Sequence, residues 1–192
     1  MQLRFQSYKK AEKKYIKQIS TCDWAKLEAM WADIKSRKVV NGWPMGKALE
    51  YMFIRAFDLE NADVVYPYSN CIINAEEQID GFIFLKDIGV GFIVECKDWS
   101  DSVSFDEVAK LHSRLLYRPS TTFAIFVSIN GFTPSATELI YMMHPHCILF
   151  WNQTDIDECF KNRKFVEALI YKYQFAMMSA DPYITVFDGK NI

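Results

Sequence analysis

Three charged residues near the middle of the chain have the types and the spacing for chemistry on a phosphate group. Glu95 lies inside the apolar stretch "GVGFIVECKDWS", and Lys97 follows two residues later. Side chains two apart on a strand point to the same face, so the carboxylate and the ammonium should project together. Charged side chains at the end of an apolar strand are unfavourable unless each has an ionic partner or binds a metal.

Asp80 supplies a second carboxylate from the preceding segment. The sequence "KDIGVG" predicts a turn between two adjacent strands, which places Asp80 and Glu95 at the same end of the ladder. Two carboxylates can bind Mg²⁺, with Mn²⁺ as a substitute, and leave positions for water and a phosphate oxygen. Beside such an ion, Lys97 could position a water nucleophile or stabilise charge in the transition state.

The rest of the sequence predicts the elements that position these residues. Apolar periodicity and turn signals give an α/β order with a mixed sheet flanked by helices. Ser104 and Glu107 match an S-x-x-E capping box at the start of one helix. Helices are expected at 8–19, 23–37, 47–59, 104–117 and 155–178 and from 133 onward, and strands at 64–66, 71–74, 79–85, 90–96, 121–130 and 146–151, with 183–187 as a candidate edge strand.

Length and composition predict one folded domain with an appendage. The chain has 192 residues, of which 51% are hydrophobic, so it can bury a substantial core. The break at "VVNGWPMG" separates a basic helical extension, residues 1–40, from a core at 41–160, with a C-terminal helix and short strand at 161–192. The extension holds ten Lys/Arg and four Asp/Glu, a balance of +6, whereas residues 41–192 hold twelve and twenty, a balance of −8.

Localisation is expected to be cytoplasmic, without a membrane span. The apolar runs are strand-sized, well below the roughly 20 residues that a membrane helix needs. No export signal is evident, and the five cysteines show no CxxC spacing, which favours free thiols in a reducing compartment.

The D-(14 residues)-E-x-K pattern and its surroundings resemble the PD-(D/E)XK nuclease superfamily and, within it, the catalytic domain of Mrr-type restriction endonucleases. The resemblance covers about residues 45–160, through the segments "GKALEYMFIRAF", "QIDGFIF", "FIVECKDW", "TTFAIFVSINGFTPSATELI" and "CILFWNQTDIDECF". It implies a restriction-endonuclease-like αβββαβ core and a metal-dependent DNA endonuclease. It also implies that Asp80 and Glu95 bind the metal, that Lys97 is the catalytic lysine, and that Glu50 is a further catalytic acid.

Two positions depart from the usual Mrr pattern. Glu95 stands where many members carry Gln, and this change favours metal binding. The sequence reads "IDG" where members usually have "GID", which leaves Asp87, in the turn, as a poor alternative to Asp80. For Glu50, the alternative to a catalytic role is a solvated position on its helix.

Two sets of basic residues are candidates for binding DNA phosphates. The extension contributes Lys13, Lys14 and Lys17, and the 104–117 region contributes Lys110, Arg114 and Arg118, which recur at every fourth position. For the second set, an exposed helix face without a ligand is the alternative.

Other functions and partners stay open. The alternatives are a catalytically silent nuclease-fold domain that binds DNA or a protein, a structure-selective nuclease such as a junction resolvase, and an interaction module in which D…ExK is incidental. A double-strand cut needs two sites, which would suit a homodimer. No DNA-reading domain is evident in the sequence, so a separate DNA-reading subunit would supply recognition.

Overall fold

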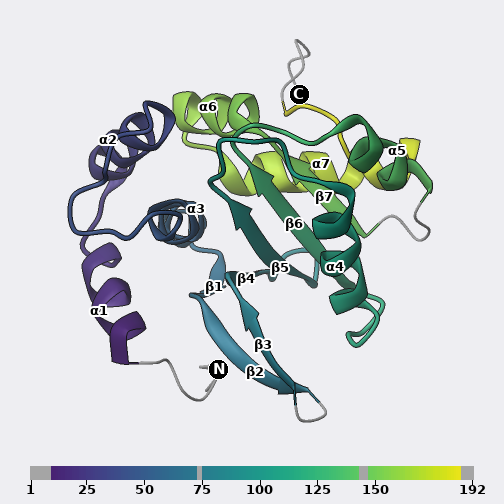
Figure 1. Ribbon diagram of the computed structural model, residues 1–192, viewed down its shortest axis with the longest axis horizontal. Helices are drawn as coiled ribbons and strands as arrows, with labels where there is room; N and C mark the ends of the chain where they lie inside the picture. Colours follow the sequence, from purple (N-terminus) through teal and green to yellow (C-terminus); the bar gives the residue numbers. More distant parts are fainter. Residues whose placement is uncertain (1–9, 73–74, 143–146, 187–192) are drawn as a thin grey trace.

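The computed structural model describes residues 10–72, 75–142 and 147–186, and its centre is a five-stranded mixed sheet (Figure 1). The strand order is β1-β4-β5-β6-β7, where β1 and β5 each pair antiparallel with β4 while β5, β6 and β7 run parallel. The predicted mixed α/β sheet is therefore confirmed. The strands are β1 (Asp63–Val65), β4 (Gly81–Leu85), β5 (Val90–Lys97), β6 (Thr122–Ser128) and β7 (Ile148–Trp151).

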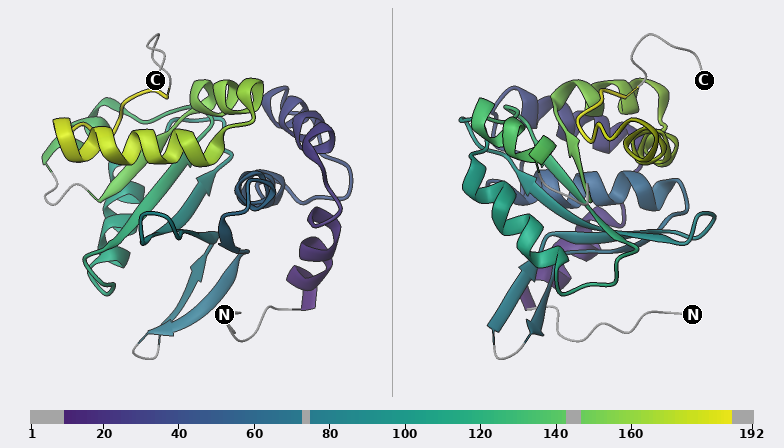
Figure 2. Two further views of the ribbon diagram at one scale, coloured as in Figure 1. Left: turned by 180° about the vertical axis from the view of Figure 1, so that it is seen from behind. Right: turned by 90° about the vertical axis from the view of Figure 1, so that its right-hand side faces the viewer.

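Helices cover both faces of this sheet (Figures 1 and 2). Side chains alternate along β5, so Phe92 and Val94 enter the core cluster on one face and Ile93 enters the cluster on the other. This two-sided burial explains why β5 reads as a continuous apolar run. The first face is covered by α3 (Lys47–Leu59), α6 (Gln153–Asn162) and α7 (Phe165–Ser179), and the second by α4 (Phe105–Leu115) and α5 (Pro134–Met142).

The two N-terminal helices, α1 (Lys10–Ile19) and α2 (Trp24–Lys35), pack on the outer side of α3 (Figure 1). Their apolar stripes explain the contact, because Leu27, Trp31 and Ile34 of α2 are buried in the same core cluster as α3. Asp23 begins α2 by accepting a hydrogen bond from the Lys26 backbone N–H at 3.0 Å.

A separate hairpin precedes β4 and projects from the sheet (Figure 2). It consists of β2 (Tyr68–Ile72) and β3 (Ala75–Ile79), so the predicted strand at 79–85 is divided at Asp80. Gly81, just after this break, lets the backbone pass close to α3, because a Cβ atom there would lie 2.0 Å from Cδ1 of Ile54. The break leaves Asp80 at the end of β4, next to the end of β5.

The C-terminal segment differs from its prediction as an edge strand. Residues 183–186 form no strand, and residue 187 lies outside the described residues. Two buried side chains hold the backbone here instead: Lys172 donates to the Ile184 carbonyl, and Asp155 accepts from the Val186 N–H at 2.8 Å. The backbone of β7 forms a hydrogen bond with the start of this segment, from the Phe150 N–H to the Pro182 carbonyl at 3.1 Å.

The long helix predicted at 155–178 is interrupted. Arg163 adopts a left-handed conformation with φ of 54° and ends α6. The Glu60 carboxylate then accepts from the N–H groups of Phe165 and Val166, at 2.6 and 3.1 Å, at the start of α7. No helix in the described part of the chain is both long and apolar enough to cross a membrane.

Candidate active site

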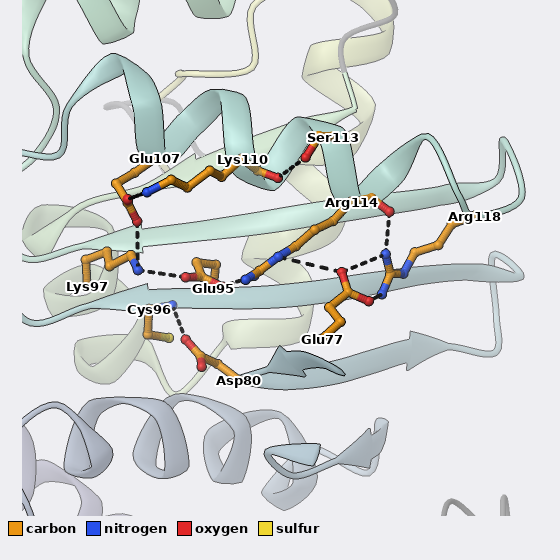
Figure 3. A network of polar contacts seen from close by, with 10 residues as sticks. All are labelled: Glu77, Asp80, Glu95, Cys96, Lys97, Glu107, Lys110, Ser113, Arg114 and Arg118. Atoms are coloured by element: carbon orange, nitrogen blue, oxygen red, sulfur yellow. Dashed lines mark hydrogen bonds and ion pairs between the residues drawn. The ribbon is translucent and has the colours of Figure 1, made fainter. Parts of the chain in front are cut away.

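The antiparallel register of β4 and β5 brings Asp80 and Glu95 to one end of the sheet. Gly81 pairs with Val94, so the residues just beyond this pair are Asp80 and Glu95. The Asp80 carboxylate accepts a hydrogen bond from the Cys96 backbone N–H at 2.9 Å (Figure 3). The expectation that a hairpin would align these two acids agrees with this geometry.

Glu95 and Lys97 project from the same face of β5, as strand alternation requires. Their side chains form an ion pair of 2.8 Å between Lys97 Nζ and Glu95 Oε1. Lys97 also lies 3.0 Å from Glu107 Oε2, on α4, and 4.9 Å from the ring centroid of Trp99. Burial acts to lower the pKa of Lys97, but the ion pairs with the two glutamates outweigh it and the pKa is raised. Lys97 is therefore an ammonium ion at neutral pH.

Asp80, Glu95 and Lys97 line a cleft of about 490 Å³. Glu50 reaches it from α3 on the opposite side of the sheet from α4, and it is only 8% exposed. The alternative of a solvated Glu50 is therefore wrong, because α3 is buried around most of its circumference. Asp87 is exposed in the β4–β5 turn and does not line this cleft. The lining consists of Met45, Gly46, Glu50, Gln78, Asp80, Glu95, Cys96, Lys97, Asp98, Trp99 and Arg114.

The three acids of the cleft repel one another. Burial, and then the charges of Glu50 and Glu95, raise the pKa of Asp80 from 3.8 to about 8. Burial also raises the pKa of Glu50, against the opposing effect of its 2.6 Å ion pair with Lys47. The raised pKa values of Asp80 and Glu50 mark an electrostatic environment that a bound cation would relieve.

The second oxygen of Glu95 is taken by an arginine from α4 (Figure 3). Arg114 Nη1 lies 2.6 Å from Glu95 Oε2, and Arg114 Nε lies 3.6 Å from Glu77 on β3. Arg118 pairs with the same Glu77 at 2.7 Å. Arg114 on α4 and Arg118, three residues beyond the end of α4, thus both contact the β2–β3 hairpin, so the alternative of a simple exposed face is wrong for these two arginines.

The other basic residues predicted to bind DNA lie on the surface. Lys110 has 67% of its side chain exposed and pairs with Glu107. Lys13, Lys14 and Lys17 are exposed on α1 and do not line the cleft. Binding of phosphate by any of these residues stays a prediction.

Glu107 is the site residue that the sequence did not reveal. The predicted capping box is wrong, because Ser104 forms no side-chain capping hydrogen bond and Glu107 turns toward Lys97 and Lys110. A half-buried lysine with one carboxylate partner already on its own strand is the signal that could have prompted a search for a second acid on the next helix.

The donor chemistry of the cleft fits a hard divalent cation. Among the described residues, no group of three or more His, Cys, Asp or Glu is placed to hold an ion. Both Glu95 oxygens are in ion pairs, and one Asp80 oxygen is hydrogen bonded. Carboxylate oxygens are nevertheless the ligands that Mg²⁺ and Mn²⁺ prefer, and Asp80 and Glu95 could supply them once Glu95 exchanges a basic partner.

About half of the chain is similar to a known protein family. Residues 66–159 match the Mrr_cat family model, which is described as "Restriction endonuclease". No curated protein matches the chain.

Several solved structures are distantly similar to this chain, among them the following three. A protein of unknown function, AF1548, is 16% identical with a TM-score of 0.45, over 55% of this chain and 57% of that one. A repair endonuclease from Pyrococcus abyssi is 16% identical with a TM-score of 0.39, over 59% and 49%. The MspJI restriction endonuclease in complex with a 27-mer oligonucleotide is 15% identical with a TM-score of 0.40, over 84% and 36%. This chain thus spans less than two thirds of each of those chains.

Proposed function

Because residues 66–159 match the Mrr_cat restriction-endonuclease family model, we propose that the cleft around Asp80, Glu95 and Lys97 hydrolyses phosphodiester bonds in DNA with the help of a divalent metal. One observation carries this proposal. Two buried acids and a paired lysine converge in one cleft at the ends of adjacent strands, inside the segment that matches the family.

Asp80 and Glu95 are the residues that would hold Mg²⁺ or Mn²⁺, with Glu50 behind them as a third acid. When bound, such an ion would supply the positive charge that offsets the repulsion between a phosphate anion and an incoming nucleophile. Asp80 is anchored for this role by its hydrogen bond to the backbone of β5, which fixes the carboxylate relative to Glu95.

Lys97 would act as a positive charge and a hydrogen-bond donor. Its raised pKa keeps the ammonium protonated at neutral pH, so it is unsuited to accept a proton from water. Held between Glu95 and Glu107, it can orient a water molecule or stabilise the charge that builds on the phosphate oxygens.

Arg114 is the best placed of the proposed DNA-binding residues, because it lines the cleft and keeps 28% of its side chain exposed. Arg118 is 12% exposed and fixed on Glu77, so it would act mainly by holding the hairpin. The exposed lysines of α1 would add attraction for a polyanion without sequence selectivity.

A cleavage assay tests the proposal directly. Supercoiled plasmid is incubated with the full chain and Mg²⁺ or Mn²⁺, and the wild type is compared with Asp80→Ala and Lys97→Ala. Nicking should fall on the order of 10²-fold or more in both variants, since each removes a group that acts on charge in the transition state. Lys86→Ala is the matched control, because Lys86 is 64% exposed and pairs with Asp63 outside the cleft. Nicking that persists in both cleft variants would refute the assignment of the site.

A DNA-binding domain without catalysis is the second candidate. The observation that favours it is the pair of ionic contacts that occupy both Glu95 oxygens. Retained DNA binding with no cleavage in either metal would select this alternative. A homodimer and a separate DNA-reading subunit stay predictions, which the molecular mass of the active species would test.

A further inference from the structure

A second cavity, of about 390 Å³, lies beside the cleft and has no part in the proposed hydrolysis. The two cavities share Met45, Gly46 and Asp98 in their linings, so they adjoin along the loop that leads into α3 and along the residue that follows Lys97. Its volume falls within the range of roughly 300–1,000 Å³ that is usual for small-molecule sites.

The inner wall of this cavity is apolar. Ile34, Trp43 and Ala48 line it and are almost fully buried, with 2%, 7% and 4% of their surface exposed. Trp43 is fixed from behind, because its ring stacks on Tyr15 with centroids 5.3 Å apart and lies 5.3 Å from the ring of Tyr51. The Trp43 ring is thus held in place by its aromatic neighbours without a ligand.

The rim combines exposed apolar side chains with positive charge. Val39 and Met45 are 87% and 93% exposed, far more than core-forming side chains usually are. The exposed Lys38 lies on the same rim, and so does Arg37, whose side chain is 40% exposed and pairs with Asp98 of the same lining. A ligand that suits this lining has an apolar planar face and an attached anion.

A nucleotide outside a base stack has both of these features. In a paired and stacked duplex, the faces of the bases cover one another, so an apolar wall would find only backbone and base edges. An unpaired or extruded base exposes a planar face that can stack on an aromatic ring, while its phosphate stays near basic side chains.

We propose that this cavity, the base pocket (Ile34, Arg37, Val39, Trp43, Met45 and Ala48), receives the base of one unpaired nucleotide of a DNA strand whose phosphate lies in the adjoining cleft. The inference rests on the proposed function, and it names the substrate as DNA that contains an unpaired nucleotide. The inference also explains why the two cavities adjoin, since one DNA strand could place its base in the base pocket and its phosphate in the cleft.

The test measures binding with no divalent metal added, so that it does not depend on cleavage. Three short duplexes are compared: one fully paired, one with a single bulged 2-aminopurine, and one with an abasic residue at the bulge. The bulged base should bind about tenfold more tightly than either of the other duplexes, in line with base–aromatic stacking, and its fluorescence should be quenched on binding.

The double variant Val39→Ser/Met45→Ser should lose this preference, because it removes the apolar rim from two exposed positions where folding is little affected. Leu116→Ser/Met178→Ser is the matched control: it removes similar side chains, 71% and 79% exposed, from outside the base pocket, and should keep the preference.

Equal affinity for the three duplexes, no binding to any of them, or an unchanged preference in the rim variant would overturn the inference. Different results would refute the proposed function and the base pocket. A chain that prefers the bulged base but never nicks DNA would refute catalysis alone, and a chain that nicks plasmid without the preference would refute the base pocket alone.

Discussion

Replacing Asp80 by Asn should stabilise the cation-free protein while it removes a proposed metal ligand. Asp80 is 9% exposed, and burial together with the charges of Glu50 and Glu95 raises its pKa from 3.8 to about 8. At pH 7 the unfolded chain releases this proton, whereas the folded chain keeps most of it. The pH lies 3.2 units above the ordinary pKa of 3.8, so holding the proton lowers the free energy of unfolding by at most about 4 kcal/mol. Asparagine can still accept the hydrogen bond from Cys96, but its buried NH₂ group has no assured partner. Allowing about 1–2 kcal/mol for that group leaves an expected gain of about 2 kcal/mol.

The same substitution should change how stability depends on pH. Between pH 4 and 8 the folded wild type holds the Asp80 proton and the unfolded chain does not, so the free energy of unfolding falls as the pH rises. The slope from this one group is up to about 1.4 kcal/mol per pH unit, and Asp80→Asn should lack it. Urea denaturation followed by tryptophan fluorescence, in EDTA and at several pH values, measures both quantities. Asp87→Asn, at an exposed position in the β4–β5 turn, is the matched control and should change neither.

A divalent metal should make the wild type more stable than Asp80→Asn, the reverse of the order expected without metal. Addition of Mg²⁺ or Mn²⁺ should raise the unfolding free energy of the wild type, because the ion binds the folded state, and should have little effect on Asp80→Asn. An Asn variant that is less stable than the wild type in EDTA, with an unchanged pH slope, would show that Asp80 does not lie among repelling acids. Equal stabilisation of both proteins by the metal would show that Asp80 is not a ligand.

Three further substitutions test other parts of the structure. Lys172→Met should lower the free energy of unfolding by roughly 3–5 kcal/mol in urea, because it leaves the buried carboxylate 3.1 Å away without its partner. Gly81→Ala should cost about 1–3 kcal/mol in the wild type, since the added Cβ would lie 2.0 Å from Ile54 Cδ1, and it should cost less when it is introduced into an Ile54→Ala background. Glu107→Gln should lower the pKa of Lys97 by removing one of its two anionic partners, so the alkaline limb of the cleavage-against-pH profile should move to lower pH.

The features that were predictable from the sequence depend on local spacing. Alternation along one strand places Glu95 and Lys97 on one face, and a short turn aligns Asp80 with Glu95. Neither inference needs knowledge of distant parts of the chain. The mixed sheet follows similarly from the apolar runs and from the helices between them.

The features that were missed depend on contacts between distant segments. Arg118 and Glu77 are 41 positions apart, and their pairing exists only because the β2–β3 hairpin lies against α4. Glu107 gives up a local capping role because Lys97, at the end of a buried strand, gains more from a second carboxylate. In both cases an ionic contact formed by the tertiary fold overrides the preference that the local sequence expresses.

Net charge is a poor guide to the proposed substrate, because the charges that would meet DNA are local. The chain as a whole carries a charge of −2, which by itself does not favour a polyanion. In the cleft, however, much of the acidic charge is already matched, since Glu95 contacts both Lys97 and Arg114, and Glu50 contacts Lys47. A divalent ion among these acids would make the local charge positive and would compete with the basic side chains for Glu95. The acids that lower the net charge of the protein are thus the same groups that would let its cleft attract a phosphate.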